Sequence, residues 1–118
     1  MPYVDGFLMV VPTAKLAAYR RLARAAGEVW QQHGALEYRE CVGDDLSQKG
    51  PASFRRRSGA KRRESVVFSW IVYRSRSHRD RVMAKVMADP RLAAMMQRSP
   101  PFDPRRISYG GFRLLVDL

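Results

Sequence analysis

The spacing of apolar residues along this chain alternates between the period of a strand and that of a helix, and this alternation restricts the fold to few topologies. Apolar and β-branched residues fill two segments almost without interruption, as in strands that are covered on both faces. In a third segment, apolar and polar residues alternate, so one face of that strand is more polar. A fourth segment contains two adjacent glycines that indicate a bulge or a close backbone approach. The four predicted strands are residues 3–11, 36–42, 64–73 and 107–116.

Two helices are predicted between these strands. Apolar residues recur every three or four positions from 14 to 33, with Thr13 as a candidate N-cap and Gly34 at the C-terminal end. A second helix is predicted to begin near Ser77, because Asp80 follows three residues later in a capping-box spacing. It is interrupted at Pro90, which suits the first residue of a short further helix.

The resulting order is strand, helix, strand, strand, helix, strand. Right-handed crossovers then place the first and third strands together at the centre, with both helices on one face. We therefore predict an α+β fold: a ferredoxin-like βαββαβ antiparallel sheet that forms one domain over residues 1–118. Residues 43–63 have no sustained period and predict a long loop, of which 46–63 is the basic part.

The composition narrows the class of protein. No apolar stretch near the start approaches the ~20 residues that a membrane-spanning helix needs, and no basic residue precedes Lys15, so neither a membrane span nor an export signal is predicted. The single cysteine, Cys41, cannot form an internal disulfide. These features together predict a cytoplasmic protein.

The aromatic residues predict a second copy of the chain as a partner. Two helices do not cover all the aromatic side chains of the strands, and an exposed aromatic face is a liability for a monomer. Packing of one sheet on another would cover it, so we predict a homodimer. The residues concerned are Phe7, Trp70, Tyr73, Tyr109 and Phe112.

Several segments resemble the domain of unknown function 1428 family of small bacterial proteins. They are Tyr3–Phe7, His33–Tyr38 with Glu40–Val42, Val67–Tyr73, Lys85–Arg91 and Tyr109–Phe112. The resemblance spans nearly the whole chain and implies a dimeric α+β barrel, but no activity. Met83 departs from the family's pattern, which has Asn there, and residues 55–63 are more basic than that pattern.

Three polar residues are candidates for acid–base chemistry. His33 ends the first helix, where it suits either a general acid or base, or a histidine that caps the helix end or is hydrogen-bonded inside the dimer. Asp5 and Glu40 interrupt apolar strands, and burial raises the pKa of a carboxyl group as a general base requires. A salt bridge to Arg39 or Arg113 is the structural alternative for these two carboxylates.

A pocket for a small hydrophobic ligand is the leading functional hypothesis. Aromatic residues and methionines are numerous beside few polar groups, a combination that suits an apolar binding pocket. The alternative is that these residues form only core and dimer interface. The predicted ligand-binding residues are Tyr38, Trp70, Tyr73 and Tyr109, next to Met83, Met87, Met95 and Met96.

A basic cluster supports a different class of function. Six basic side chains fall within nine residues and supply more than half of the net charge of +11. They predict binding to the phosphates of RNA or DNA, although only Phe54 is available there for base stacking. The alternative is a solvated loop. The cluster consists of Arg55, Arg56, Arg57, Lys61, Arg62 and Arg63.

The sequence predicts no metal site and no cofactor. Zinc-ligand spacing and a glycine-rich phosphate loop are both absent from it, and Gly110-Gly111 is too short to count as one. It is compatible with catalysis, with ligand binding alone, or with a non-catalytic interaction dimer.

Overall fold

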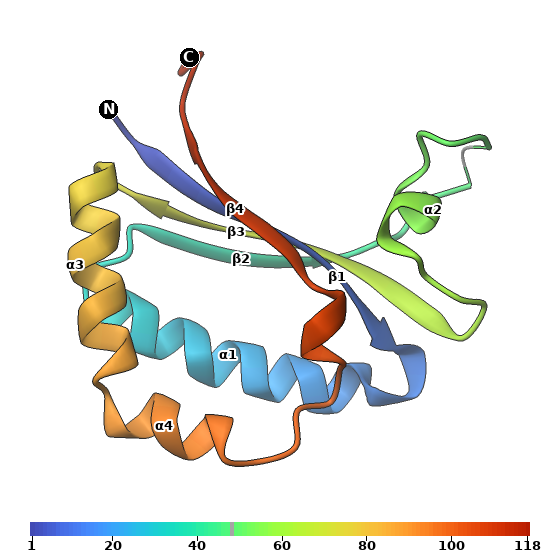
Figure 1. Cartoon of the computed structure of the whole chain (residues 1–118), viewed down its shortest axis with the longest axis horizontal. Helices are drawn as coiled ribbons and strands as arrows, with labels where there is room; N and C mark the ends of the chain where they lie inside the picture. Colours follow the sequence, from blue (N-terminus) through green and yellow to red (C-terminus); the bar gives the residue numbers. More distant parts are fainter. Residues whose placement is uncertain (48) are drawn as a thin grey trace.

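The computed structural model, which describes residues 1–47 and 49–118, is a four-stranded antiparallel sheet with helices on both sides (Figure 1). The strand order is β2-β3-β1-β4, so the first and third strands are central as predicted. The strands are β1 (Tyr3–Pro12), β2 (Glu37–Val42), β3 (Glu64–Tyr73) and β4 (Ser108–Arg113). The helices are α1 (Leu16–Gln32), α2 (Phe54–Ser58), α3 (Arg76–Met87) and α4 (Pro90–Met96), with 3-10 turns η1 (Thr13–Lys15) and η2 (Pro104–Arg106).

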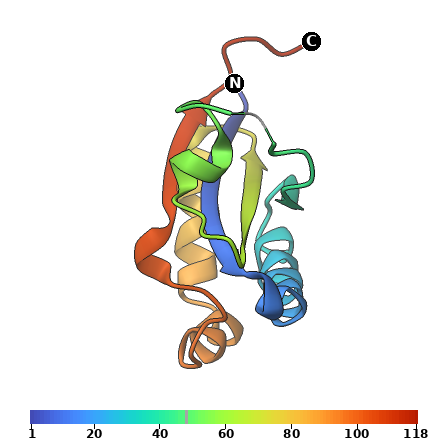
Figure 2. The ribbon, with the colours of Figure 1, turned by 90° about the vertical axis from the view of Figure 1, so that its right-hand side faces the viewer.

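The two faces of the sheet have different coverings. Helices α1, α3 and α4 gather on one side, which we call the helix face, and α2 lies on the other side, which we call the open face (Figures 1 and 2). The register pairs Phe7 with both Ser69 and Tyr109, so these residues share the helix face. Trp70 and Phe112 belong to the alternate set and therefore lie on the open face.

The core lies between the helix face and the helices. Val11 and Tyr73 are completely buried on the central strands, and Val82 and Val86 of α3 pack in the same layer. Gly34 has a positive φ of 114°, which suits the left-handed end that α1 requires. No described helix combines the length and the apolar character needed to cross a lipid bilayer.

Two helix starts differ from the prediction. Helix α3 is capped by Ser75, not Ser77: its side chain accepts a hydrogen bond from the His78 backbone N–H at 3.1 Å. The His78 ring in turn accepts one from the N–H of Arg74, the residue before the cap, so the bond resembles a capping box but is shifted by one residue. Thr13 does not cap α1 but lies in the 3-10 turn before it and contacts Ser65.

The basic loop 46–63 also differs, because it contains α2. Ser53 caps this short helix by accepting from the Arg56 N–H, and Gly59 ends it with a φ of 73°. Gln48 of this loop lies outside the described residues. The last strand ends at Arg113, three residues earlier than predicted.

Candidate functional site

An inner cavity of about 640 Å³ lies between the helix face, helices α1, α3 and α4, and the segment that leads into β4. Its walls are mostly apolar, which is typical of sites for small organic ligands. Phe7 and Tyr109, whose rings stack at 6.2 Å, line it from the sheet, and methionines line it from the helices. These methionines are Met83, Met87, Met95 and Met96.

One polar group of the inner cavity is an ion pair beneath α3. The Asp5 carboxylate accepts a hydrogen bond from Arg79 Nη1 at 2.8 Å, and Asp5 is buried. Burial raises the pKa of Asp5, and the nearby Arg79 guanidinium and Tyr73 hydroxyl oppose that shift. Asp5 therefore combines a cation contact with the raised pKa that a proton acceptor needs.

Arg79 was not predicted as a site residue, although the sequence contained a signal for it. It lies three and seven residues before Val82 and Val86, which are the buried residues of α3, so it shares their helix face. Its guanidinium also lies over the Tyr3 ring, 4.9 Å from the centroid. Arg79 is one of four arginines in residues 74–81 and does not stand out by residue type, but only its position has that spacing.

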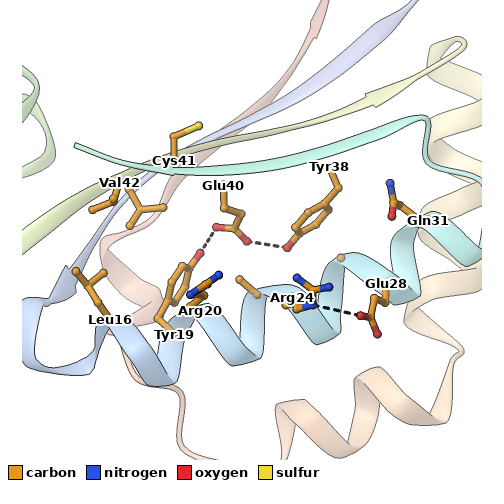
Figure 3. A pocket seen from close by; sticks show the side chains of 13 residues that line it. Leu16, Tyr19, Arg20, Arg24, Glu28, Gln31, Tyr38, Glu40, Cys41 and Val42 are labelled. Atoms are coloured by element: carbon orange, nitrogen blue, oxygen red, sulfur yellow. Dashed lines mark hydrogen bonds and ion pairs between the residues drawn. The ribbon is translucent and has the colours of Figure 1, made fainter. Parts of the chain in front are cut away.

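The second polar group is the Glu40 carboxylate, which is held by two tyrosines (Figure 3). Tyr38 Oη donates to Glu40 Oε2 at 2.7 Å, and Tyr19 Oη donates to Oε1. Burial, followed by the Glu40 charge, raises the pKa of both phenols, so both stay protonated donors at neutral pH. The Tyr38 ring lies against Gly27 of α1, where an added Cβ would come within 2.7 Å of it.

An outer groove of about 680 Å³ runs between α1 and the edge strand β2 (Figure 3). It shares Tyr19, Tyr38 and Glu40 with the inner cavity, so this cluster forms the wall between the two. Arg20 and Arg24 lie along the α1 side of the groove, and Arg24 is 3.6 Å from Glu28.

The other predicted site residues do not line the inner cavity. His33 Nε2 lies 2.7 Å from Asp89, which caps α4 and is also held by Arg91, so His33 joins the end of α1 to the start of α4. Arg91 and then His33 hold the pKa of Asp89 well below its usual range. This geometry matches the helix-capping alternative for His33.

Trp70 and Tyr73 do not line the inner cavity, for two different reasons. Trp70 lies on the open face and donates to Glu37 Oε1 at 3.0 Å, since residues at even positions of β3 point away from the helices. Tyr73 is on the helix face but is completely buried in the core, where its hydroxyl accepts from Trp30 Nε1 at 3.2 Å. The structure thus brings Asp5, Glu40, Tyr38 and Tyr109 to one cavity.

The basic cluster divides into two kinds of side chain. Arg55 donates to the Lys61 and Glu64 carbonyl oxygens, so it stabilises its own loop. Arg56 and Arg57 are exposed on α2, and Lys61, Arg62 and Arg63 are exposed in the turn that follows it. Nucleic-acid binding by this exposed group stays a prediction. Within residues 1–47 and 49–118, no three His, Cys, Asp or Glu side chains are grouped to hold a metal ion.

Comparison with known proteins places the chain among relatives of the same length. The family model described as "Protein of unknown function (DUF1428)" matches residues 2–104. "Uncharacterized protein YbaA" of Escherichia coli K12 is 42% identical over 117 residues, which is 99% of each chain, and the protein of the same name from Shigella flexneri matches equally.

Solved structures share the fold at low sequence identity. Rv0793 from Mycobacterium tuberculosis has a TM-score of 0.59 at 14% identity, covering 99% of this chain and 98% of its own. A NIPSNAP domain protein from Burkholderia xenovorans has a TM-score of 0.57 at 15% identity, covering 95% and 93%. A mutant of SnoaB, a cofactor-independent oxygenase from Streptomyces nogalater, has a TM-score of 0.54 at 14% identity, covering 99% and 96%.

Proposed function

We propose that this chain, which belongs to the DUF1428 family, binds a small hydrophobic molecule with one polar group in the inner cavity. The observation that carries the proposal is an apolar cavity of about 640 Å³ with the Asp5–Arg79 pair and the Glu40 cluster in its walls. Methionine side chains adapt to ligands of varied shape, which suits such a site.

The polar groups define how a ligand would be oriented. The apolar part would lie among Phe7, Tyr109 and the methionines, and the polar group would face Asp5 and Arg79. Asp5 is the group suited to accept a proton from the ligand, because burial raises its pKa. SnoaB shows that an oxygenase has been built on a similar fold, but a fold alone does not determine a reaction, so our proposal is binding.

A second copy of the chain completes the proposal. Phe68 and Phe112 on the open face are 46% and 63% exposed, and α2 covers only one end of this face. Packing of two open faces would bury these side chains, with the helices and inner cavities outside. The cytoplasmic location predicted from the sequence stays a prediction.

The ligand site can be tested by placing a larger side chain in the inner cavity and measuring the binding of a probe. The probe is the fluorescent dye 1-anilinonaphthalene-8-sulfonate, whose emission rises in apolar surroundings. Ala26 of α1 lines the inner cavity, whereas Ala17 of the same helix is exposed and lines neither space. Ala26→Phe should weaken dye binding at least tenfold, which corresponds to about 1.4 kcal/mol, while the matched variant Ala17→Phe should bind like the wild type. Equal binding by both variants would show that the dye occupies another surface and would contradict the proposal.

A further inference from the structure

Strand β2 is an edge of the sheet with unused backbone groups. The Gly43 N–H donates to the Val66 carbonyl at 2.8 Å, which fixes the register at this end of the β2–β3 pair. In an antiparallel pair, alternate residues direct their backbone groups to the partner and away from it. Tyr38, Glu40 and Val42 therefore direct their N–H and C=O groups outward, and an edge of this kind can accept an additional strand.

The outer groove lies beside this edge and offers apolar contacts to such a strand. Leu16, Val42 and Val67 line the groove, and Arg20 lies along its rim. A strand with apolar side chains toward the groove would contact these residues, and an acidic residue on its other side would face Arg39, which lies on the opposite face of β2.

Residues 114–118, Leu-Leu-Val-Asp-Leu, have the matching properties. Leu115 is 94% exposed and Val116 is 69% exposed, which is unusual for adjacent large apolar side chains. The Leu114 N–H bonds weakly to the Pro2 carbonyl at 3.4 Å. In an extended conformation, Leu114, Val116 and Leu118 would form one apolar side, and Leu115 and Asp117 the other.

Segment 114–118 and the outer groove lie at opposite edges of the sheet within one chain. Segment 114–118 follows β4, whereas the groove borders β2, and β3 and β1 separate them. The segment also leaves the sheet on the side away from α1 and α4 (Figure 1). A second copy packed on the open face would lie on that side.

We propose that segment 114–118 of one copy adds a strand to the β2 edge of a second copy, and that the same segment of the second copy adds a strand to the β2 edge of the first. This inference rests on the dimer proposed above. Leu114, Val116 and Leu118 enter the partner's outer groove, and Leu115 and Asp117 lie on the other side, beside Arg39 and Cys41. The Cys41 side chain points away from the groove, as this arrangement requires (Figure 3). A reciprocal exchange follows from two-fold symmetry.

The single native cysteine provides the test. In the full chain, Leu115→Cys and Val116→Cys are made separately, oxidised under mild conditions, and the bonded peptides are identified by mass spectrometry. Leu115→Cys should give a Cys41-to-115 disulfide between two copies in several-fold higher yield than Val116→Cys. Neighbouring strand residues point to opposite faces, so each variant is the control for the other.

Three other results would each contradict the proposed strand exchange, and they differ in what they imply for the dimer. Equal yields at 115 and 116 would indicate a flexible tail that collides at random, not a paired strand. Absence of the bond, while native mass spectrometry still shows a dimer of the unmodified protein, would remove the exchange and leave the dimer. A monomeric mass would remove both, and the dye experiment would still report on the inner cavity.

Discussion

The two faces of this sheet use alternate residues of the same strands for different purposes. On the helix face, Val11 and Tyr73 are fully buried, and Asp5 has a partner. On the open face, Phe68 and Phe112 keep about half or more of their surface exposed, because α2 is only five residues long. The comparison indicates that the helix face stabilises the chain, whereas the open face remains available for a partner.

The buried polar groups need no second copy of the chain. Among the described residues, no buried side-chain nitrogen or oxygen lacks a hydrogen-bond partner. The buried polar groups of the helix face are thus satisfied within one chain. On the open face, the exposed side chains of Phe68 and Phe112 would be covered by a second copy.

The largest expected effect is loss of stability from the helix face. Tyr73→Ala should lower the free energy of unfolding by about 3–5 kcal/mol, the usual cost of removing a buried aromatic ring. Urea unfolding followed by circular dichroism measures this loss. Phe68→Ala, on the same strand but on the open face, should cost about 1 kcal/mol. Similar losses for the two variants would contradict the division between the faces.

The next effect concerns association. Phe112→Lys should leave the monomer folded and weaken the dimer by about 2 kcal/mol, roughly thirtyfold in dissociation constant, because a charge would enter a buried interface. Analytical ultracentrifugation measures the constant. Tyr109→Lys is the matched control, since Tyr109 lies on the same strand but on the helix face. A dimer that is insensitive to Phe112→Lys, or equally sensitive to both changes, would exclude the open face as the interface.

The smallest effect is a pH dependence at the covered end of the open face. Arg106, and then the Lys61 backbone N–H, lower the pKa of Glu64 from 4.5 to about 2. The folded state thus favours the ionised carboxylate, so its contribution to stability is complete above pH 4.5 and is lost as the pH falls toward 2.

Glu64→Gln isolates this contribution from that of other carboxylates with lowered pKa, such as Asp89. The melting temperature of the wild type should fall more steeply than that of Glu64→Gln between pH 4.5 and 2. Parallel curves would indicate that apolar contacts alone hold this end of the open face.

Much of the fold was predictable because it depends on local periodicity. The sequence pattern located the strand Glu64–Tyr73 with its observed bounds, and crossover geometry then gave the central position of β1 and β3. Helix α2 was missed because one helical turn has no measurable period. Its signals were the N-cap Ser53 and the left-handed Gly59.

The candidate site was less predictable because it depends on which residues share a face and on distant partners. Trp70 was grouped with Tyr38 as an aromatic residue, although the strand period places it on the open face. His33 meets Asp89, which is 56 positions away, and no local pattern indicates that pair. Arg79 was identifiable from helical spacing, but its carboxylate partner on β1 required the folded sheet.

The contact between Gly27 and Tyr38 restricts the order in which this sequence can change over evolutionary time. Glycine inside a helix is less favourable than alanine by about 1 kcal/mol, so mutation to alanine would ordinarily be a gain. Here the Cβ of alanine would meet the Tyr38 ring. Alanine becomes acceptable at position 27 only after Tyr38 has been replaced by a smaller residue, and that replacement removes one of the two phenols that hold Glu40. The history of the Glu40 cluster is thus tied to a residue that has no side chain.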